Sequence, residues 1–409
     1  MAEIRLGLWQ IRDLKNLKER LMIKPVFQAF SEIEHRSRIK LAREELAAAG
    51  YDGCVIVAPE NLFYLTGYDS VCANICPQAL ILSVDENRDP TLLIRNLDLP
   101  LVKETSWLTD VRTYQLFVDD VAKLVSEIAH DQRIADGRLG LDMQSPAVTG
   151  SYMRALEAAM KSQFADVSHL LNKIQLVKSP AEVNYVREAA RYANLGVEAA
   201  RKSLRPGISE IALCAAVERA AREAGSDYPA LPIECGSGTR SASGHATPMP
   251  KIIGPNELVH LEFAGVARRY HSVAMTTLAT GDPGEGARKL YNVARESLLA
   301  GLEQCRPGAH VADIDNGSRK PIELAGLGEA AQMRFGVGIG VAYPPIWLSS
   351  LQLDRFSAGT LVPGMTFYVH SWLSLPRDGL GVMLGGTYLV TSTGIEELSG
   401  AGPVDLFTV

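Results

Sequence analysis

The chain lacks a long apolar run and any excess of basic charge. No stretch of it approaches the roughly 18 apolar residues that a membrane-spanning helix needs, so we expect no membrane partner. Lys and Arg together number 41 against 47 Asp and Glu, which gives a net charge of −6. Because nucleic-acid binding depends on positive charge, this balance indicates that nucleic acid is not the partner.

Cysteine is scarce, with six thiols at positions 54, 72, 76, 214, 235 and 305. Only Cys72 and Cys76 are close together, and three residues separate them, not the two of a zinc knuckle or a redox motif. The N-terminus also lacks the apolar segment and small-residue cleavage site of a secretory leader. We therefore expect reduced thiols and a cytoplasmic protein.

The 409 residues are enough for two hydrophobic cores, since single cores stop growing near ~250–300 residues. Strand-like runs occur at 79–84, 91–95 and 139–142, and helical periodicity occurs at 118–130 and 151–161. This alternation predicts an α/β domain over 37–175, preceded by a mixed, charged arm over 1–36. An amphipathic helix is predicted from Ile39 to Ala49.

A second domain is predicted over 176–409, beginning with a long helix. Ser179 before Pro180, with Glu182 two residues further on, is a helix-start signal, and the helix is expected to reach about Leu204. The tripeptide Arg-Pro-Gly then occurs twice, at 205–207 and 306–308, and Ala-Gly follows 19 residues after each arginine. This self-similarity predicts a duplicated half-domain, in which Pro321 interrupts the helix of the second copy.

Several segments together resemble the creatinase/aminopeptidase P family (peptidase M24), over essentially the whole chain. The matching segments are 61–67, 178–182, the two Arg-Pro-Gly copies, 244–248, the hairpin 258–281, 335–340 and 363–367. The resemblance implies an α+β fold, with a creatinase-like N-terminal α/β domain and a C-terminal pita-bread catalytic domain that carries a pseudo-twofold repeat. It also implies a homodimer.

Members of this family usually hold a dinuclear metal centre with five side chains, and none of the five keeps its identity here. The first two are normally aspartates eleven residues apart, and they align with Glu262 and Val273. The other three positions are Val337, His370 and Gly385. This set has lost the oxygen donors that hard cations need. We therefore expect no metal and no cofactor, and metal-dependent Xaa-Pro peptidase activity is the least favoured function.

The hairpin segment 262–271 resembles ectoine hydrolase, a metal-independent branch of the family, and 340–347 and 364–367 are also similar to it. In that branch the hairpin glutamate attacks a cyclic amidine and histidines handle protons. The resemblance implies a metal-independent hydrolase of a C–N bond in a small non-peptide substrate of the cyclic amidine, amide or guanidine type. Ile346 and the segment 272–276 replace polar groups usual in that branch, which indicates a ligand other than ectoine.

We predict Glu262 as the nucleophile or water-activating base and His245 as the acid that protonates the leaving nitrogen. Because side chains alternate along a strand, Glu262 shares a face with the residues two positions before and after it. If the hairpin turns at 266–267, Glu262 lies directly opposite His271 on the returning strand. His271 would then orient Glu262 or carry a proton. The predicted substrate-binding residues are Tyr343, Arg240, His370, Tyr270 and Trp347.

A non-catalytic module that binds a small ligand or a protein is the competing function. An enclosed polar pocket lined by Glu262 and His245 would indicate an enzyme, whereas a filled or flat site would indicate the module.

Overall fold

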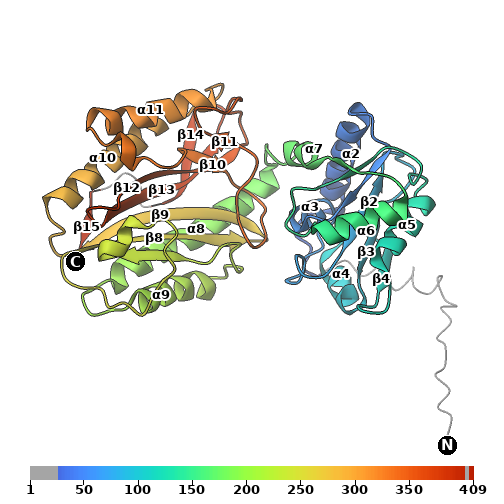
Figure 1. Ribbon diagram of the computed structural model, residues 1–409, viewed down its shortest axis with the longest axis horizontal. Coiled ribbons are helices and arrows are strands. Elements are labelled where there is room, and N and C mark those ends of the chain that lie inside the picture. Colours follow the sequence, from blue (N-terminus) through green and yellow to red (C-terminus); the bar gives the residue numbers. More distant parts are fainter. Residues whose placement is uncertain (1–25, 401–404) are drawn as a thin grey trace, which may run out of the picture. The chain divides into compact units, whose positions relative to one another are not determined.

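The computed structural model describes residues 26–400 and 405–409, in two units that divide between Leu171 and Asn172 (Figure 1). Most of the predicted N-terminal arm lies outside the described residues. No helix of the described part is long and apolar enough to cross a membrane.

The first unit is a six-stranded mixed sheet with the strand order β4-β3-β2-β1-β5-β6. Its strands are β1 (Gly53–Ile56), β2 (Ala79–Ser83), β3 (Thr91–Arg95), β4 (Val111–Tyr114), β5 (Leu139–Leu141) and β6 (Ala165–Asp166). Its helices are α2 (Glu32–Ala48), α3 (Pro59–Thr66), α4 (Leu99–Thr105), α5 (Val121–Asp131) and α6 (Gly150–Met160), with α7 (Ser168–Lys173) at the division. The predicted strands and the helices at 118–130 and 151–161 are confirmed.

Helix α2 begins seven residues earlier than predicted, at Glu32, and so includes the end of the predicted arm. Ser31 caps it by accepting a hydrogen bond from the Glu34 backbone N–H. The first turns bury His35 and Arg38 in place of apolar side chains. Hydrophobic periodicity therefore could not show where this helix starts.

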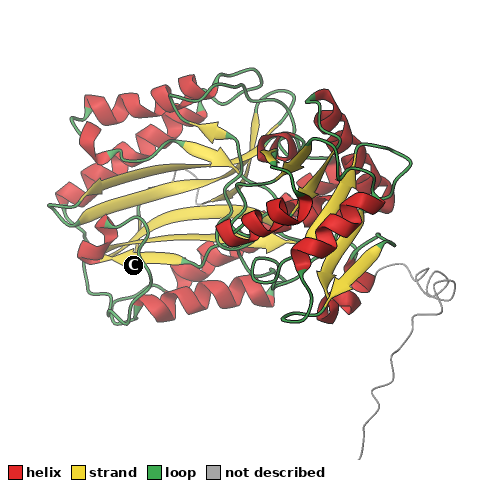
Figure 2. Ribbon diagram, turned by 45° about the vertical axis from the view of Figure 1, so that its right-hand side comes forward, coloured by secondary structure: helices red, strands yellow, loops and turns green. Residues whose placement is uncertain are grey.

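The second unit is built on one large sheet with the order β11-β10-β12-β13-β9-β8-β7, to which β14 and β15 are added on β13 and β9 (Figure 2). Its strands are β7 (Glu234–Ser237), β8 (Glu257–Ala267), β9 (Tyr270–Thr280), β10 (Gly336–Gly338), β11 (Gln352–Leu353), β12 (Thr366–Leu375), β13 (Leu380–Val390), β14 (Ile395–Gly400) and β15 (Phe407–Thr408). Its long helices are α8 (Pro180–Ser203), α9 (Glu210–Glu223), α10 (Glu285–Leu302) and α11 (Val311–Leu324).

The order of elements in this unit repeats, as the two Arg-Pro-Gly copies predicted. One copy joins α8 to α9 and the other joins α10 to α11, and each helix pair is followed by sheet strands. Gly207 and Gly308 both have positive φ, at 92° and 82°, which explains why glycine ends each tripeptide. The prediction that Pro321 interrupts its helix is wrong, because α11 continues to Leu324. Pro321 removes the N–H that would bond to the carbonyl of residue 317, and only three residues of helix follow it.

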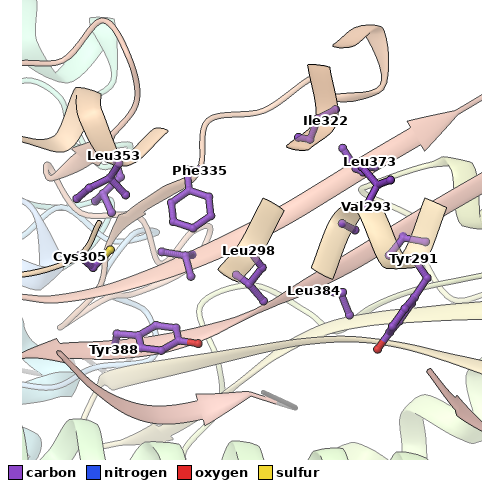
Figure 3. Packing of buried hydrophobic residues seen from close by; sticks show 14 of the residues in the cluster. Tyr291, Val293, Leu298, Cys305, Ile322, Phe335, Leu353, Leu373, Leu384 and Tyr388 are labelled. Atoms are coloured by element: carbon purple, nitrogen blue, oxygen red, sulfur yellow. The ribbon is translucent and has the colours of Figure 1, made fainter. Parts of the chain in front are cut away.

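Each helix pair covers one half of the sheet (Figure 1). Leu213 and Val217 of α9 pack with Leu261 and Phe263 of β8. Leu298 of α10 packs in the corresponding core over β12 and β13, where Figure 3 shows it beside other buried side chains. Because side chains alternate along a strand, the residues between these core positions point to the face that the helices leave free.

Candidate functional site

The helix-free face of the large sheet carries a cavity of about 80 Å³ that opens to solvent. Its lining residues are Leu231, Glu234, Gly244, His245, Glu262, Met275, Met333, Arg334, Ile346, Trp347, Leu348, Tyr368, His370, Trp372 and Met383. Four of the eight predicted site residues are among them: Glu262, His245, His370 and Trp347. One wall of the cavity is therefore acidic, and the rest of its lining is apolar, aromatic or basic.

Glu262 and Glu234 form the acidic wall. They are direct partners in the antiparallel pairing of β8 with β7, and both are buried, at 6% and 8% exposure. Burial, and then the charge of Glu234, raises the pKa of Glu262 well above its ordinary value. Burial also raises the pKa of Glu234 to about 7. Two carboxyls in this position favour binding of a proton or of a cationic group.

His245 is exposed at the cavity, on the loop between β7 and β8. Glu210, at the start of α9 and fully buried, holds this loop on both sides of His245. One carboxylate oxygen accepts hydrogen bonds from the Ser237 backbone N–H and hydroxyl at 3.0 and 2.7 Å, and the other accepts one from the Met249 N–H at 2.9 Å. The position of His245 therefore depends on a buried carboxylate that does not itself line the cavity.

The basic wall comes from His370 and Arg334. His370 is buried at 3% exposure, and within the described residues neither of its ring nitrogens makes a hydrogen bond. Burial, and then the positive charge of Arg334, lowers the pKa of His370 to about 4, so its imidazole is neutral at pH 7. The buried Nε of Arg334 likewise has no hydrogen-bond partner among the described residues. These unsatisfied groups are suited to a polar ligand.

The predicted pairing of Glu262 with His271 is wrong. The hairpin turns at Arg268 and Arg269, not at 266–267, so Glu262 lies opposite Met275 and His271 lies opposite Val266. Glu262 and His271 share a face but are separated along it by about 13 Å, at roughly 3.3 Å per residue. The two turn arginines have positive φ, at 47° and 66°, where turn rules favour Asn or Gly.

Contacts of the Arg269 side chain explain this unusual turn. Its guanidinium is buried, donates hydrogen bonds to the Tyr228 and Ala342 carbonyls, and lies over the rings of Tyr228 and Tyr343. Tertiary anchoring therefore sets the register. Tyr343, predicted as a substrate-binding residue, is 2% exposed in this stack and does not line the cavity.

His271, Tyr270 and Arg240 also lie away from the cavity lining. The Nε2 atom of His271 accepts a hydrogen bond from the Ala230 N–H at 2.9 Å, and its Nδ1 atom lies 2.9 Å from the Arg269 carbonyl, to which it donates. Burial lowers the pKa of His271 to about 3, so the ring is neutral with both nitrogens engaged. Such a histidine supports the fold and does not exchange protons with Glu262.

Tyr270 and Arg240 have structural partners as well. The Tyr270 hydroxyl donates to Glu182 at 2.7 Å, in the first turn of α8. Arg240 donates to Glu210 at 3.3 Å and to the Thr247 carbonyl at 2.6 Å, within the loop that carries His245. Tyr270 and Arg240 therefore stabilise elements around the site and do not line the cavity.

Comparison with known proteins gives one family match for each of the two parts of the chain. Residues 184–392 match the sequence profile of metallopeptidase family M24, and residues 38–177 match that of the creatinase/prolidase N-terminal domain. The chain belongs to metallopeptidase family M24.

Its M24 relatives carry different activities in their names. Ectoine hydrolase of Halomonas elongata is 27% identical over 390 residues, covering 90% of this chain and 96% of that protein. An uncharacterized hydrolase/peptidase of Sinorhizobium fredii is 26% identical over 383 residues, covering 90% and 96%. The Xaa-Pro dipeptidase structure from Bacillus anthracis superposes with a TM-score of 0.81 at 24% identity, covering 92% of this chain and all of that one. The last likeness establishes the fold alone.

The residues at the M24 metal positions do not fit a metal centre. Val273 and Val337 pack in one apolar cluster with Trp347. A Cβ added to Gly385 would lie 2.0 Å from the Val369 carbonyl oxygen, so the backbone leaves no room for a ligand there. Within the described residues no group of three or more His, Cys, Asp or Glu side chains could hold a metal ion. Of the five positions only Glu262 keeps a carboxylate, which is too few oxygen donors for a metal centre.

Sequence reasoning missed three polar residues of the cavity: Glu234, Arg334 and Tyr368. Burial, and then the charge of Glu262, raises the pKa of the Tyr368 hydroxyl, which places this group close to the acidic wall. Alternation along 366–375 could have identified Tyr368 and Trp372 as sharing the face of His370. No local signal marks Glu234 or Arg334, because only the register of β7 on β8 and the loop before β10 bring them to the site.

Proposed function

We propose that this M24 hydrolase cleaves a C–N bond in a small non-peptide substrate of the cyclic amidine, amide or guanidine type, without a metal ion. The observation that carries the proposal is the cavity, in which Glu262 and His245 line one space while two of the metal positions, Val273 and Val337, are apolar. A hollow site in which a few polar groups converge between apolar walls, and not a filled or flat one, favours an enzyme over a binding module. The similarity to ectoine hydrolase supports the same reaction class.

Glu262 supplies the attack, either directly or by activating water. In the direct route a carboxylate oxygen bonds to the electrophilic carbon, the C–N bond breaks, and water later releases the acyl group from Glu262. In the water route Glu262 takes a proton from water as the water oxygen bonds to the carbon. In both routes the leaving nitrogen gains a proton, which His245 supplies. Because His245 is exposed, it can recover that proton from solvent.

A positively charged substrate would offset the effect of the acidic wall on the protonation of Glu262. In the free protein, burial and the charge of Glu234 favour the protonated form of Glu262, which cannot attack. An amidinium or guanidinium group placed against the wall stabilises the ionised carboxylate, because opposite charges within ~4–6 Å favour the charged form. Binding of a cationic substrate group therefore generates the reactive form of Glu262.

Turnover of ectoine, hydroxyectoine, creatine and related cyclic amidines, followed by LC-MS with EDTA-treated protein, tests the proposal. We expect hydrolysis to survive the chelator, and to be lost in Glu262→Gln and strongly reduced in His245→Ala. Glu223→Gln is the matched control, since Glu223 is an exposed partner of Arg219 on α9. Activity that EDTA abolishes and Mn²⁺ or Co²⁺ restores, or full activity in Glu262→Gln, would refute the proposal.

A further inference from the structure

Glu234 is placed to act directly with Glu262. The register of β7 on β8 sets the two residues opposite each other, so their Cβ atoms are about 4.5–5.5 Å apart. Both side chains line the cavity. The Oε2 atom of Glu234 is buried and has no hydrogen-bond partner among the described residues. A carboxyl that only stabilised the strand pair would be expected to have its oxygens satisfied.

No cation neutralises this pair in the described part of the chain, where neither Glu234 nor Glu262 forms an ion pair with Lys, Arg or His within 4 Å. The other titratable groups that face the cavity or the same strand surface are His245, His260, His271, Arg334, Tyr368 and His370. Of these only Arg334 carries a fixed positive charge. Two carboxylates so close in a buried site cannot both be ionised at low cost, so one of them holds a proton.

We propose that Glu234 is a second catalytic carboxyl, which holds a proton beside Glu262 and donates it to the leaving nitrogen. This inference rests on the proposed C–N hydrolysis and gives the direct donation to Glu234 in place of His245, which then relays protons from solvent. In the free protein the shared proton is held by Glu262, and a cationic substrate group set against Glu262 shifts that proton to Glu234. Glu262, now ionised, takes a proton from water as the water oxygen bonds to the substrate carbon. The C–N bond then breaks, and its electron pair takes the proton of Glu234.

The pair ends this step with the same number of protons as it began. Glu262 has gained one proton and Glu234 has lost one, so transfer between the two carboxyls restores the starting state. No oxidant, reductant or metal is needed. His245, exposed at the cavity, then exchanges protons between the site and solvent, and Glu234 is the donor beside the reacting atoms.

Carboxyl NMR tests the coupling without any substrate. Protein labelled with ¹³C at the glutamate side-chain carboxyl is titrated as wild type, Glu234→Gln, Glu262→Gln and the exposed control Glu223→Gln. If the carboxyls are coupled, removal of either charge lowers the titration midpoint of the other by about one to two pH units, from a Coulomb interaction over ~5 Å. The control leaves both midpoints unchanged. Midpoints that do not move in either cavity variant would overturn the pairing.

Kinetics then tests the catalytic role. In Glu234→Gln we expect kcat to fall at least tenfold with KM little changed, and the limb of the pH–rate profile that reports the acid to disappear. Glu234→Asp, which keeps a carboxyl, restores part of kcat. A pH profile that Glu234→Gln leaves intact would overturn the catalytic role. Failure of the proposed function is distinct, since wild type would then hydrolyse no C–N substrate while the NMR coupling remained.

Discussion

Replacing Glu210 by Gln is expected to destabilise the protein and to weaken catalysis from outside the cavity. Glu210 is fully buried, and its carboxylate accepts hydrogen bonds on both sides of His245, from Ser237 and Met249. Gln keeps one oxygen acceptor, but its amide places an NH₂ group where one carboxylate oxygen was. If that group occupies the Oε2 position, it meets the Met249 N–H, which is then buried without an acceptor. If it occupies the other position, the Ser237 N–H and hydroxyl lose theirs.

The magnitude follows from these contacts. A buried donor left unsatisfied costs about 1–3 kcal/mol, and hydrogen bonds to a charged group are worth about 1.5–3 kcal/mol each. Because one acceptor oxygen survives, we expect the free energy of unfolding to fall by about 2–4 kcal/mol. The Arg240 ion pair adds little, since Arg240 is 35% exposed.

Urea denaturation of wild type, Glu210→Gln and Glu223→Gln at pH 7 gives this difference. Glu223 lies on the same helix but is exposed, so its variant is expected to stay within about 0.5 kcal/mol of wild type. Glu210→Gln is also expected to lower kcat, because His245 is less well held. A Glu210→Gln protein as stable as the control would refute the reasoning that this carboxylate holds the loop.

Three other perturbations test the site. Because burial raises the pKa of Glu234 from its ordinary 4.5 to about 7, the folded state binds this proton more tightly than the unfolded chain does. The contribution of Glu234 to stability therefore falls by roughly 2–3 kcal/mol as pH rises from 4.5 to 7, after allowance for its partial exposure. Glu234→Gln removes this loss, so its free energy of unfolding relative to wild type rises by that amount between pH 4.5 and pH 7.5 in urea titrations; a difference independent of pH would contradict the assignment. Val273→Asp buries an unpaired charge in an apolar cluster, so we expect the free energy of unfolding to fall by several kcal/mol. We also expect calorimetry to detect no Mn²⁺ binding by this variant; stoichiometric binding would contradict the conclusion that the site does not fit a metal centre. Because Arg334 carries the fixed positive charge of the cavity, Arg334→Gln is expected to raise KM at least tenfold for substrates with a carboxylate and to change KM little for those without one. Equal changes for both kinds of substrate would show that Arg334 does not contact the substrate carboxylate.

The elements of the fold could be predicted where local chemistry decides them. Ser179 and Glu182 form the capping box that the helix-start signal indicated, and the Arg-Pro-Gly copies mark corresponding turns. The start of α2 could not be predicted, because buried His35 and Arg38 break the apolar pattern. The prediction of the turn in the β8–β9 hairpin failed for a related reason, because contacts with aromatic rings distant in the sequence hold two arginines at positive φ.

The site could be predicted in part. Glu262, His245, His370 and Trp347 were identified from the family resemblance, and the structure places all four in one cavity. Four other candidates proved to have partners elsewhere. His271 illustrates the cause: an error of two residues in the turn position moved it by four residues along the strand relative to Glu262. Glu234 could not be found at all from sequence, because its role depends on which strand lies beside β8.

The duplicated helix-turn-helix and strand units divide the cavity between them. Glu234, His245 and Glu262 come from the first copy, whereas Arg334, Tyr368 and His370 come from the second. Neither copy alone contains both an acidic and a basic wall. A chain cut in the segment between β9 and α10 would yield two fragments that are each inert, and activity would return only on reassociation. The proposed reaction is thus a property of the junction between the two copies, since each copy supplies a wall of opposite charge.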